Sequence, residues 1–153
     1  MKYIWKIPTT SQEHLPPGAT IAPLIISSDK TRLMNFWGDA SAWLVYLTIS
    51  NIPKEIKQRP SSHGTVLLGY LPVPKFDCFT KDTSLAKYQL FIKCMSILME
   101  CLVEAGRKGE DMVCTDSWIQ QIWPIFAAYV ADYPKQCLVV CCMENRCPIY
   151  TAM

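Results

Sequence analysis

The chain has 153 residues, of which 50% are hydrophobic and 18% are charged, and its formal net charge is +2. This length and composition suit one globular domain of ordinary size, or part of one, with a single hydrophobic core. The charge balance falls well short of the strongly basic composition that by itself indicates nucleic-acid binding. Charge therefore neither establishes nor excludes a DNA partner.

The sequence carries no pattern of a secretory signal or of a membrane span. Pro8, Pro16 and Pro17 interrupt the first 20 residues before an apolar run can form. The longest apolar stretches, at 122–132 and 137–142, are shorter than the roughly 18 to 20 residues that a spanning helix needs. We expect an intracellular protein without membrane contact, whose eight cysteines are reduced and either buried or bound to a metal.

The first half of the chain is typical of a small sheet. Residues 1–20 are polar and proline-rich, as in a linker or a cut N-terminal end, and ordered structure is expected from Ile21. Short apolar runs with β-branched residues predict strands at 22–28, 42–50 and 63–73, with a loop over residues 29–41. Because the connections are short, the three strands are expected to form an antiparallel meander.

From Ser84 the apolar residues recur every three or four positions, which predicts a helix lying across the sheet and ending at Gly106. The stripe is formed by Leu85, Tyr88, Phe91, Ile92, Met95, Leu98, Met99 and Leu102. Its methionine and aromatic members are expected to be core residues and not part of a cofactor site. The apolar segment 122–132 is interpreted as a fourth strand, although its alanines also suit a helix, and 134–142 as a short helix. The expected fold class is α+β.

Two aspartates follow predicted strands: Asp29 after the first and Asp132 after the fourth. If these strands are neighbours, the two carboxylates meet at one end of the sheet, with carboxyl carbons within about 8 Å, and a divalent cation would relieve their repulsion. Judged from the residues alone, an aspartate that opens a turn or caps a helix is the commoner alternative at both positions. Asp116, in CTDSW, is interpreted as a helix N-cap.

Four long segments resemble the transposases of Plavaka-type elements, fungal relatives of the CACTA DNA transposons. In chain order they are LPPGATIAPLIISSDKTRL, AWLVYLTISNIPK, RPSSHGTVLLGYLPV and PIFAAYVADYPKQCLVVCCMENRCP. The resemblance covers about residues 15 to 149. It implies that residues 21–153 form a partial RNase H-like transposase core, incomplete at the C-terminus, whose first and fourth strands carry metal-binding aspartates.

The resemblance also implies a chemistry. Asp29 and Asp132 would be catalytic and would bind Mg²⁺ or Mn²⁺, so that an activated water attacks the phosphodiester at a transposon end and the freed 3′ hydroxyl then attacks target DNA. The family's third acidic residue lies on a later helix, and because the chain ends at Met153 before it, cleavage by this chain alone is not expected. DNA is the implied partner and the nucleus the implied location.

The family also tends to carry a Cys-x-x-Cys pair after the second aspartate. Here Cys147 is present but Tyr150 stands in the partner's place, so Cys147 is at most the remnant of a zinc half-site, and zinc is not expected in the chain. Cys141, Cys142 and Cys147 could together ligate zinc, but their spacing matches no recognised zinc motif, and buried free thiols are the commoner alternative. His63, in SSHG, lacks the motif of a nucleophilic hydrolase.

One alternative belongs to a different functional class. The chain would then be a non-enzymatic remnant, or a DNA- or protein-binding module derived from a transposable element, that binds DNA, an intact transposase or a second copy of itself. Whether it is an enzyme is left open at this stage. Scattered cations could contact DNA phosphates, although such residues more often form a solvated face; they are Lys54, Lys57, Arg59, Arg107 and Lys108.

Overall fold

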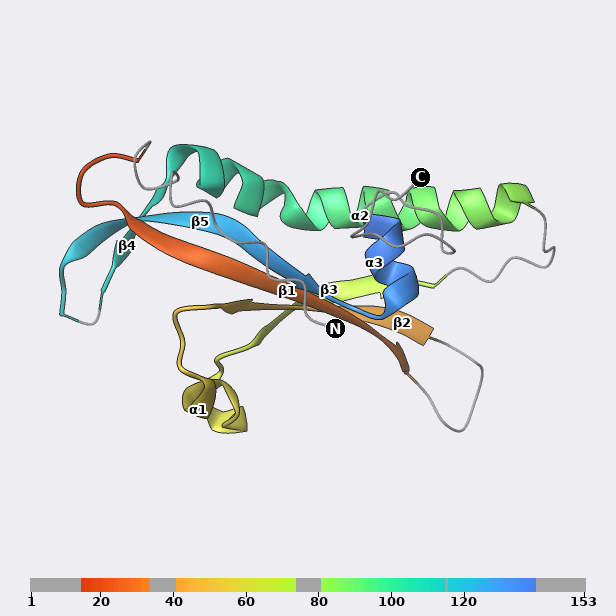
Figure 1. Ribbon diagram of the computed structural model, residues 1–153, viewed down its shortest axis with the longest axis horizontal. Coiled ribbons are helices and arrows are strands. Elements are labelled where there is room, and N and C mark those ends of the chain that lie inside the picture. Colours follow the sequence, from red (N-terminus) through yellow and green to blue (C-terminus); the bar gives the residue numbers. More distant parts are fainter. Residues whose placement is uncertain (1–14, 34–40, 74–80, 115, 140–153) are drawn as a thin grey trace, which may run out of the picture. The chain divides into compact units, whose positions relative to one another are not determined.

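The computed structural model describes residues 15–33, 41–73, 81–114 and 116–139. Within these ranges the fold class is α+β, as predicted (Figure 1). The strands are β1 (Thr20–Arg32), β2 (Ser41–Ile49), β3 (Val66–Pro72), β4 (Glu110–Val113) and β5 (Ile119–Val130). The helices are α1 (Lys54–Lys57), α2 (Lys81–Lys108) and α3 (Tyr133–Val139), with a 3₁₀ turn, η2 (Pro60–Ser62), after α1.

The described strands form one sheet in the order β3-β2-β1-β5-β4. The first three strands are neighbours in sequence order, as expected for a meander. The predicted fourth strand, β5, lies beside β1, also as expected. Residues 20–26 of β1 and 119–129 of β5 belong to the same compact part of the chain, and they run in the same direction (Figure 1).

The chain divides into two compact units, each assembled from segments that lie far apart in the sequence. The first contains residues 1–26, 47–66 and 99–129, and the second contains residues 27–46, 67–98 and 130–153. Each unit therefore includes part of β1, part of β2 and part of α2. Tertiary packing, and not chain continuity, holds each unit together.

In the first unit, α2 packs closely on β5. The prediction that Gly106 ends this helix is wrong. The helix continues to Lys108. A Cβ added to Gly106 would lie 2.9 Å from the carbonyl oxygen of Pro124, so this glycine permits a close approach of helix and strand backbones. Gly109 follows the helix with φ +74°, and its N–H donates to the carbonyl of Ala105 at 2.8 Å, which is the usual left-handed helix end.

The second unit has a core in which α2, β2 and α3 meet. Phe91 of α2 is 2% exposed, and Val45 of β2 and Cys137 of α3 are completely buried. The rings of Phe91 and Trp43 pack edge to face, with centroids 5.3 Å apart, a favourable arrangement for two aromatic quadrupoles.

The predicted helical stripe is only partly buried. Phe91 is in the core, whereas Leu85, Tyr88 and Ile92 are exposed by 55%, 37% and 46%. The expectation that the aromatic residues of the stripe are core is therefore confirmed for Phe91 and wrong for Tyr88. A helical residue is buried only where another element covers it, and in this unit Trp43 of β2 covers Phe91.

All four predicted strands differ from their predicted bounds: β2 by one residue at each end, and the others by more. β3 begins at Val66 and not at His63, because His63 has a left-handed backbone conformation that a strand does not use. β1 continues through Asp29 to Arg32, where a loop was expected, because main-chain pairing can extend past the last buried side chain, here Ser28. β5 begins at Ile119 because it pairs antiparallel with β4, in a register that runs from Glu110 opposite Ile122 to Val113 opposite Ile119. This hairpin was not predicted.

Asp116 lies in the turn of that hairpin, so its interpretation as a helix N-cap is wrong. No helix follows it, since the chain enters β5. Its Oδ1 accepts a hydrogen bond from the main-chain N–H of Trp118 at 3.1 Å. Aspartates commonly bond the backbone two residues later in tight turns, and the residue therefore has a structural role here.

Candidate functional site

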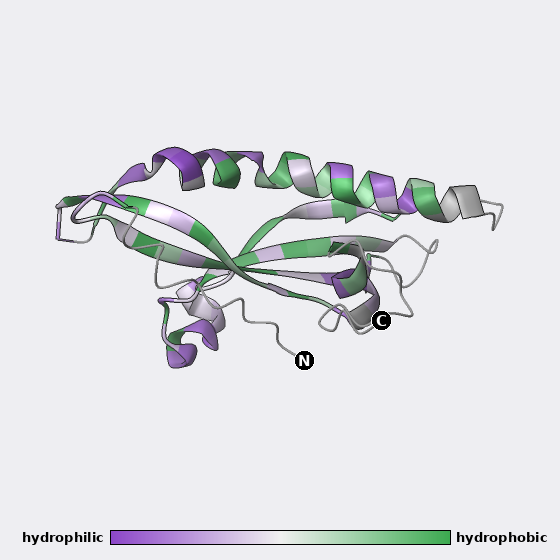
Figure 2. Cartoon of the chain, turned by 45° about the horizontal axis from the view of Figure 1, so that its top comes forward, coloured by the Kyte–Doolittle hydropathy of each residue, from purple (hydrophilic) through white to green (hydrophobic). Residues whose placement is uncertain are grey.

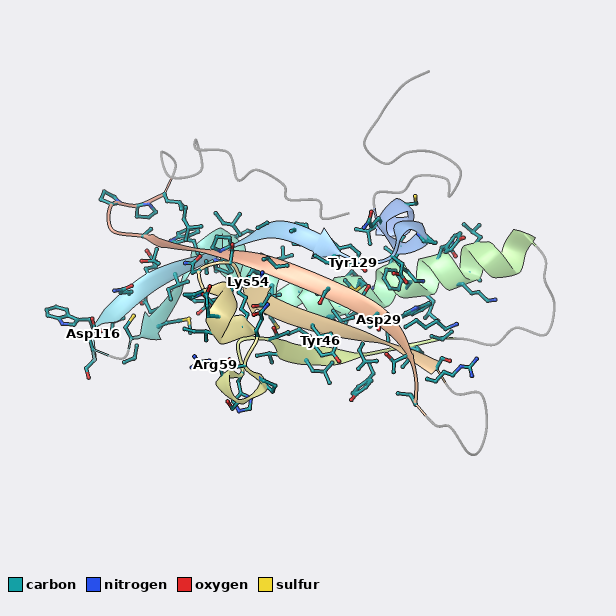
Figure 3. The ribbon with its side chains drawn as sticks, turned by 60° about the horizontal axis from the view of Figure 1, so that its bottom comes forward. Asp29, Tyr46, Lys54, Arg59, Asp116 and Tyr129 are labelled. Atoms are coloured by element: carbon teal, nitrogen blue, oxygen red, sulfur yellow. The ribbon has the colours of Figure 1, made fainter. Side chains whose placement is uncertain are left out.

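Asp29 lies near the end of β1 with an exposed side chain (Figure 3). Leu24, Ile26 and Ser28 are buried, at 6%, 3% and 7% exposure, and side chains alternate between the two faces of a strand. Asp29 therefore projects from the face opposite to these three residues. A rigid strand fixes its backbone, and its carboxylate remains accessible to water and ions.

Asp132 lies two residues beyond β5, at the start of α3, and its side chain is also exposed. Its main-chain carbonyl accepts hydrogen bonds from the N–H groups of Lys135 and Gln136, at 2.9 and 3.0 Å. The side-chain Nε2 of Gln136, a residue that is 8% exposed, donates to the carbonyl of Ala131 at 2.6 Å. The first turn of α3 thus fixes the backbone of Asp132 and leaves its carboxylate free to bind a ligand.

Lys135 attaches this first turn to the core of the second unit. Its Nζ lies 3.7 Å from the ring centroid of Trp43 and 5.1 Å from that of Phe91. Both rings are buried, and a cation over an aromatic face is more strongly stabilised when water is excluded. Sequence reasoning missed this residue because periodicity carries no signal that pairs a lysine of one helix with a tryptophan of a distant strand.

Two structural facts bear on the predicted pairing of Asp29 with Asp132. Their strands, β1 and β5, are neighbours in the sheet, and both residues belong to the second compact unit. Among the described residues, no group of three or more histidine, cysteine, aspartate or glutamate side chains is arranged to hold a metal ion. The pairing of the two carboxylates, and the 8 Å separation expected for it, stay predictions.

The zinc half-site remnant lies outside the described residues. This applies to Cys141, Cys142, Cys147 and Tyr150. Within the described ranges, four cysteines are not part of a disulfide: Cys94, Cys101, Cys114 and Cys137. Of these four, Cys137 of α3 is buried in the core, Cys101 is exposed, and the other two are half-buried. The expectation that the cysteines are buried as small apolar residues is therefore confirmed for Cys137 alone among these four.

The five cations noted in the sequence have different surroundings. Lys108, at the end of α2, forms a salt bridge with Glu104 at 2.6 Å, so its charge is locally balanced. Lys54, Lys57 and Arg59 instead lie together on the short connection between β2 and β3. His63 follows them with φ +49° in an exposed turn.

Comparison with known proteins gives one match. A family model described as Plavaka transposase matches residues 1–153, which is the whole chain. No curated protein and no solved structure matches the chain. In the described part of the chain, no helix combines the length and the apolar character that crossing a membrane would require.

Proposed function

The chain belongs to the Plavaka transposase family, and from that premise we propose that it carries two catalytic carboxylates, Asp29 and Asp132, of a metal-dependent DNA transposase on an RNase H-like sheet. The reaction class is phosphodiester hydrolysis followed by strand transfer. The partner is DNA at the ends of a transposable element, and the site of action is the nucleus.

One observation carries this proposal: the two strands that present Asp29 and Asp132 are neighbours, although 103 positions separate these residues in the sequence. Residues of parallel neighbouring strands that lie near the strands' C-terminal ends share one edge of the sheet, which is where α/β and α+β proteins commonly bind ligands. The neighbouring positions of β1 and β5 in the sheet support the RNase H-like core that the resemblance implies, because its first and fourth strands carry the two aspartates.

The donor set fits a hard divalent cation. Carboxylate oxygens are the ligands that Mg²⁺ and Mn²⁺ prefer, and both side chains are exposed, so neither needs to leave a buried salt bridge to bind an ion. When bound, such an ion neutralises charge on a phosphate and makes a bound water a stronger nucleophile.

The protein's own contribution is to fix the main chain of both aspartates. Asp29 is fixed by the strand pairing of β1. Asp132 is fixed by the first turn of α3, which the cation–π contact of Lys135 attaches to Trp43. A preorganised pair of anions loses little conformational entropy when it binds an ion, and it positions a phosphodiester group for attack.

The proposal is tested by titrating the chain with Mn²⁺ and measuring the free ion by electron paramagnetic resonance. Asp29→Asn and Asp132→Asn each remove one anionic ligand, and each is expected to weaken binding by about tenfold or more, which corresponds to about 1.4 kcal/mol. Asp111→Asn is the matched control, because Asp111 is an exposed aspartate on β4. It should bind Mn²⁺ like the unaltered chain.

Equal Mn²⁺ affinity in all four proteins would overturn the proposal. The chain would then be better described as a non-enzymatic module derived from a transposable element. Weakening in only one of the two aspartate variants would also contradict it, because the proposed site needs both carboxylates.

A further inference from the structure

The connection between β2 and β3, residues 50–65, is a compact structure that we call the basic knob. It contains α1 and η2. In the first unit, α1 and the final turns of α2 lie on opposite sides of the strands (Figures 1 and 2). Neither α1 nor η2 contains a buried residue, so the knob contributes little to the core and most of its side chains are exposed.

The basic knob concentrates the positive charge of the chain. It contains Lys54, Lys57 and Arg59 against one acidic residue, Glu55, which gives +2 with His63 neutral. The formal net charge of the entire chain is also +2, so the remaining residues sum to zero. Within the described parts of the chain, none of the three cations forms a salt bridge.

The backbone of the basic knob is held in one conformation by hydrogen bonds. The single O–H of Ser62 lies within hydrogen-bonding distance of the carbonyls of both Ile56 and Arg59 and shares its proton between them, which joins η2 to the end of α1. A Cβ added to the buried Gly64 would lie 3.3 Å from the Cα of Lys57, so the last residues of the knob pack against the end of α1.

Three more hydrogen bonds attach the knob to the sheet of the first unit. The hydroxyl of Thr48 donates to the carbonyl of Gly64 at 2.6 Å. Asn51 Nδ2 donates to the carbonyl of Ile21 at 3.1 Å, and the N–H of Ser50 donates to the carbonyl of Pro23 at 2.8 Å. Such a fixed backbone lowers the ordering cost of any contact that its side chains make.

The cations lie on a short length of this backbone. Lys54 and Lys57 are three residues apart on α1, and such positions are neighbours on a helix surface. The N–H of Arg59 donates to the carbonyl of Ile56 at 3.1 Å, so Arg59 follows directly from the helix. Figure 3 shows Lys54 and Arg59 on this segment, and Figure 2 shows the segment as predominantly hydrophilic.

We propose that the basic knob binds the phosphate backbone of duplex DNA. The ligand chemistry follows from the positive charge of the knob, which suits a regular array of anions. A DNA duplex is such an array, because its two strands together carry one phosphate charge for about every 1.7 Å of helix axis. The choice of DNA over an acidic protein rests on the proposed function. Contacts of this kind position a protein on DNA without reading its sequence.

The experiment measures binding of the full chain to a fluorescein-labelled 30-base-pair duplex of arbitrary sequence, by anisotropy between 50 and 250 mM KCl with EDTA present. Each phosphate contact contributes about 0.9 to the slope of log affinity against log salt. The variant Lys54→Gln, Lys57→Gln, Arg59→Gln is expected to lower that slope by about 1.8 to 2.7. At 0.1 M KCl, loss of two contacts corresponds to a roughly 60-fold fall in affinity.

A matched control removes the same charge elsewhere: Lys93→Gln, Arg107→Gln, Lys108→Gln, three exposed cations of α2. It should change the slope by less than about 0.9. Because Lys57 is half-buried, a second variant changes only Lys54 and Arg59, which are exposed. This double variant should fold normally by circular dichroism and still lower the slope by about 1 to 2.

The proposal is overturned if the knob variants bind DNA like the unaltered chain, if the α2 control loses as much affinity, or if the unaltered chain binds polyglutamate more tightly than the duplex. EDTA keeps the outcome separate from that of the metal-site proposal, because DNA binding here needs no divalent cation. Unchanged Mn²⁺ binding by a knob variant that has lost DNA binding would show that the two surfaces act independently.

Discussion

Replacing Lys135 by glutamine tests whether the lysine holds α3, and with it Asp132, against the core. Glutamine keeps much of the aliphatic stem but removes the positive charge that lies 3.7 Å from the centroid of Trp43 and 5.1 Å from that of Phe91. Cation–π contacts contribute about 0.5–1 kcal/mol at exposed positions and about 2 kcal/mol when desolvated. Both rings are buried and Lys135 is half-buried, so we expect a loss of about 1–2 kcal/mol in the free energy of unfolding.

Urea denaturation measures this loss. With a denaturant slope near 2 kcal/mol per molar, a change of 1–2 kcal/mol lowers the midpoint by about 0.5–1 M. Lys135→Arg keeps a cation over the ring and should stay within about 0.5 kcal/mol of the original. Amide hydrogen exchange at Gln136, whose N–H donates to the carbonyl of Asp132, should become faster in the glutamine variant because the first turn of α3 opens more often.

A double-mutant cycle with Trp43→Leu isolates the contact from the other effects of each change. The two substitutions should couple by about 0.5–2 kcal/mol, because either one alone already removes the interaction between cation and ring. Additive losses, within about 0.3 kcal/mol, would refute the reasoning. They would mean that Lys135 stabilises α3 in some way that does not involve Trp43.

Two further predictions concern α2 and the residue that ends it. Gly109→Ala should destabilise the chain by about 1–3 kcal/mol, since φ is +74° and the added Cβ would lie 2.8 Å from Trp123; an unchanged urea midpoint would contradict this. Phe91→Ala should cost about 3–5 kcal/mol because the ring is 2% exposed, whereas Ile97→Ala, on the same helix at 60% exposure, should cost less than about 0.5 kcal/mol. Similar losses for the two would show that Phe91 is not a core residue.

Side-chain pattern located most of the fold because burial follows local periodicity. The β-branched apolar runs at Ile26 and Val45 are buried as predicted. The neighbouring arrangement of β1 and β5 agrees instead with the fold that the family resemblance implies. The strand β4 escaped prediction because its four residues, Glu110–Val113, are all exposed. Its pairing with β5 comes from main-chain hydrogen bonds, which leave no mark on the hydrophobic pattern.

Single residues were harder to interpret because their roles depend on distant partners. Gly106 looks like a helix stop in the sequence, yet its role depends on the carbonyl of Pro124 on another element. Lys135 has the sequence pattern of an ordinary surface lysine, and its role depends on the cation–π contact with Trp43 of a distant strand. For the candidate site, the resemblance to the family selected Asp29 and Asp132, whereas periodicity alone favoured a turn or a cap at both.

The central claim is that Asp29 and Asp132 together hold one metal ion. Its most direct test is metal-catalysed cleavage of the chain beside the residues that bind the ion. Fe²⁺ that replaces Mg²⁺, supplied with ascorbate and peroxide, produces hydroxyl radicals that cut the backbone beside its ligands, and mass spectrometry locates the cuts. If Asp29 and Asp132 hold one ion, cuts should occur near both residues, excess Mg²⁺ should suppress them, and Asp29→Asn should abolish the cut near Asp132 as well as its own. Cuts near only one of the two, or cuts near Asp132 that persist in the Asp29→Asn variant, would contradict a shared metal site.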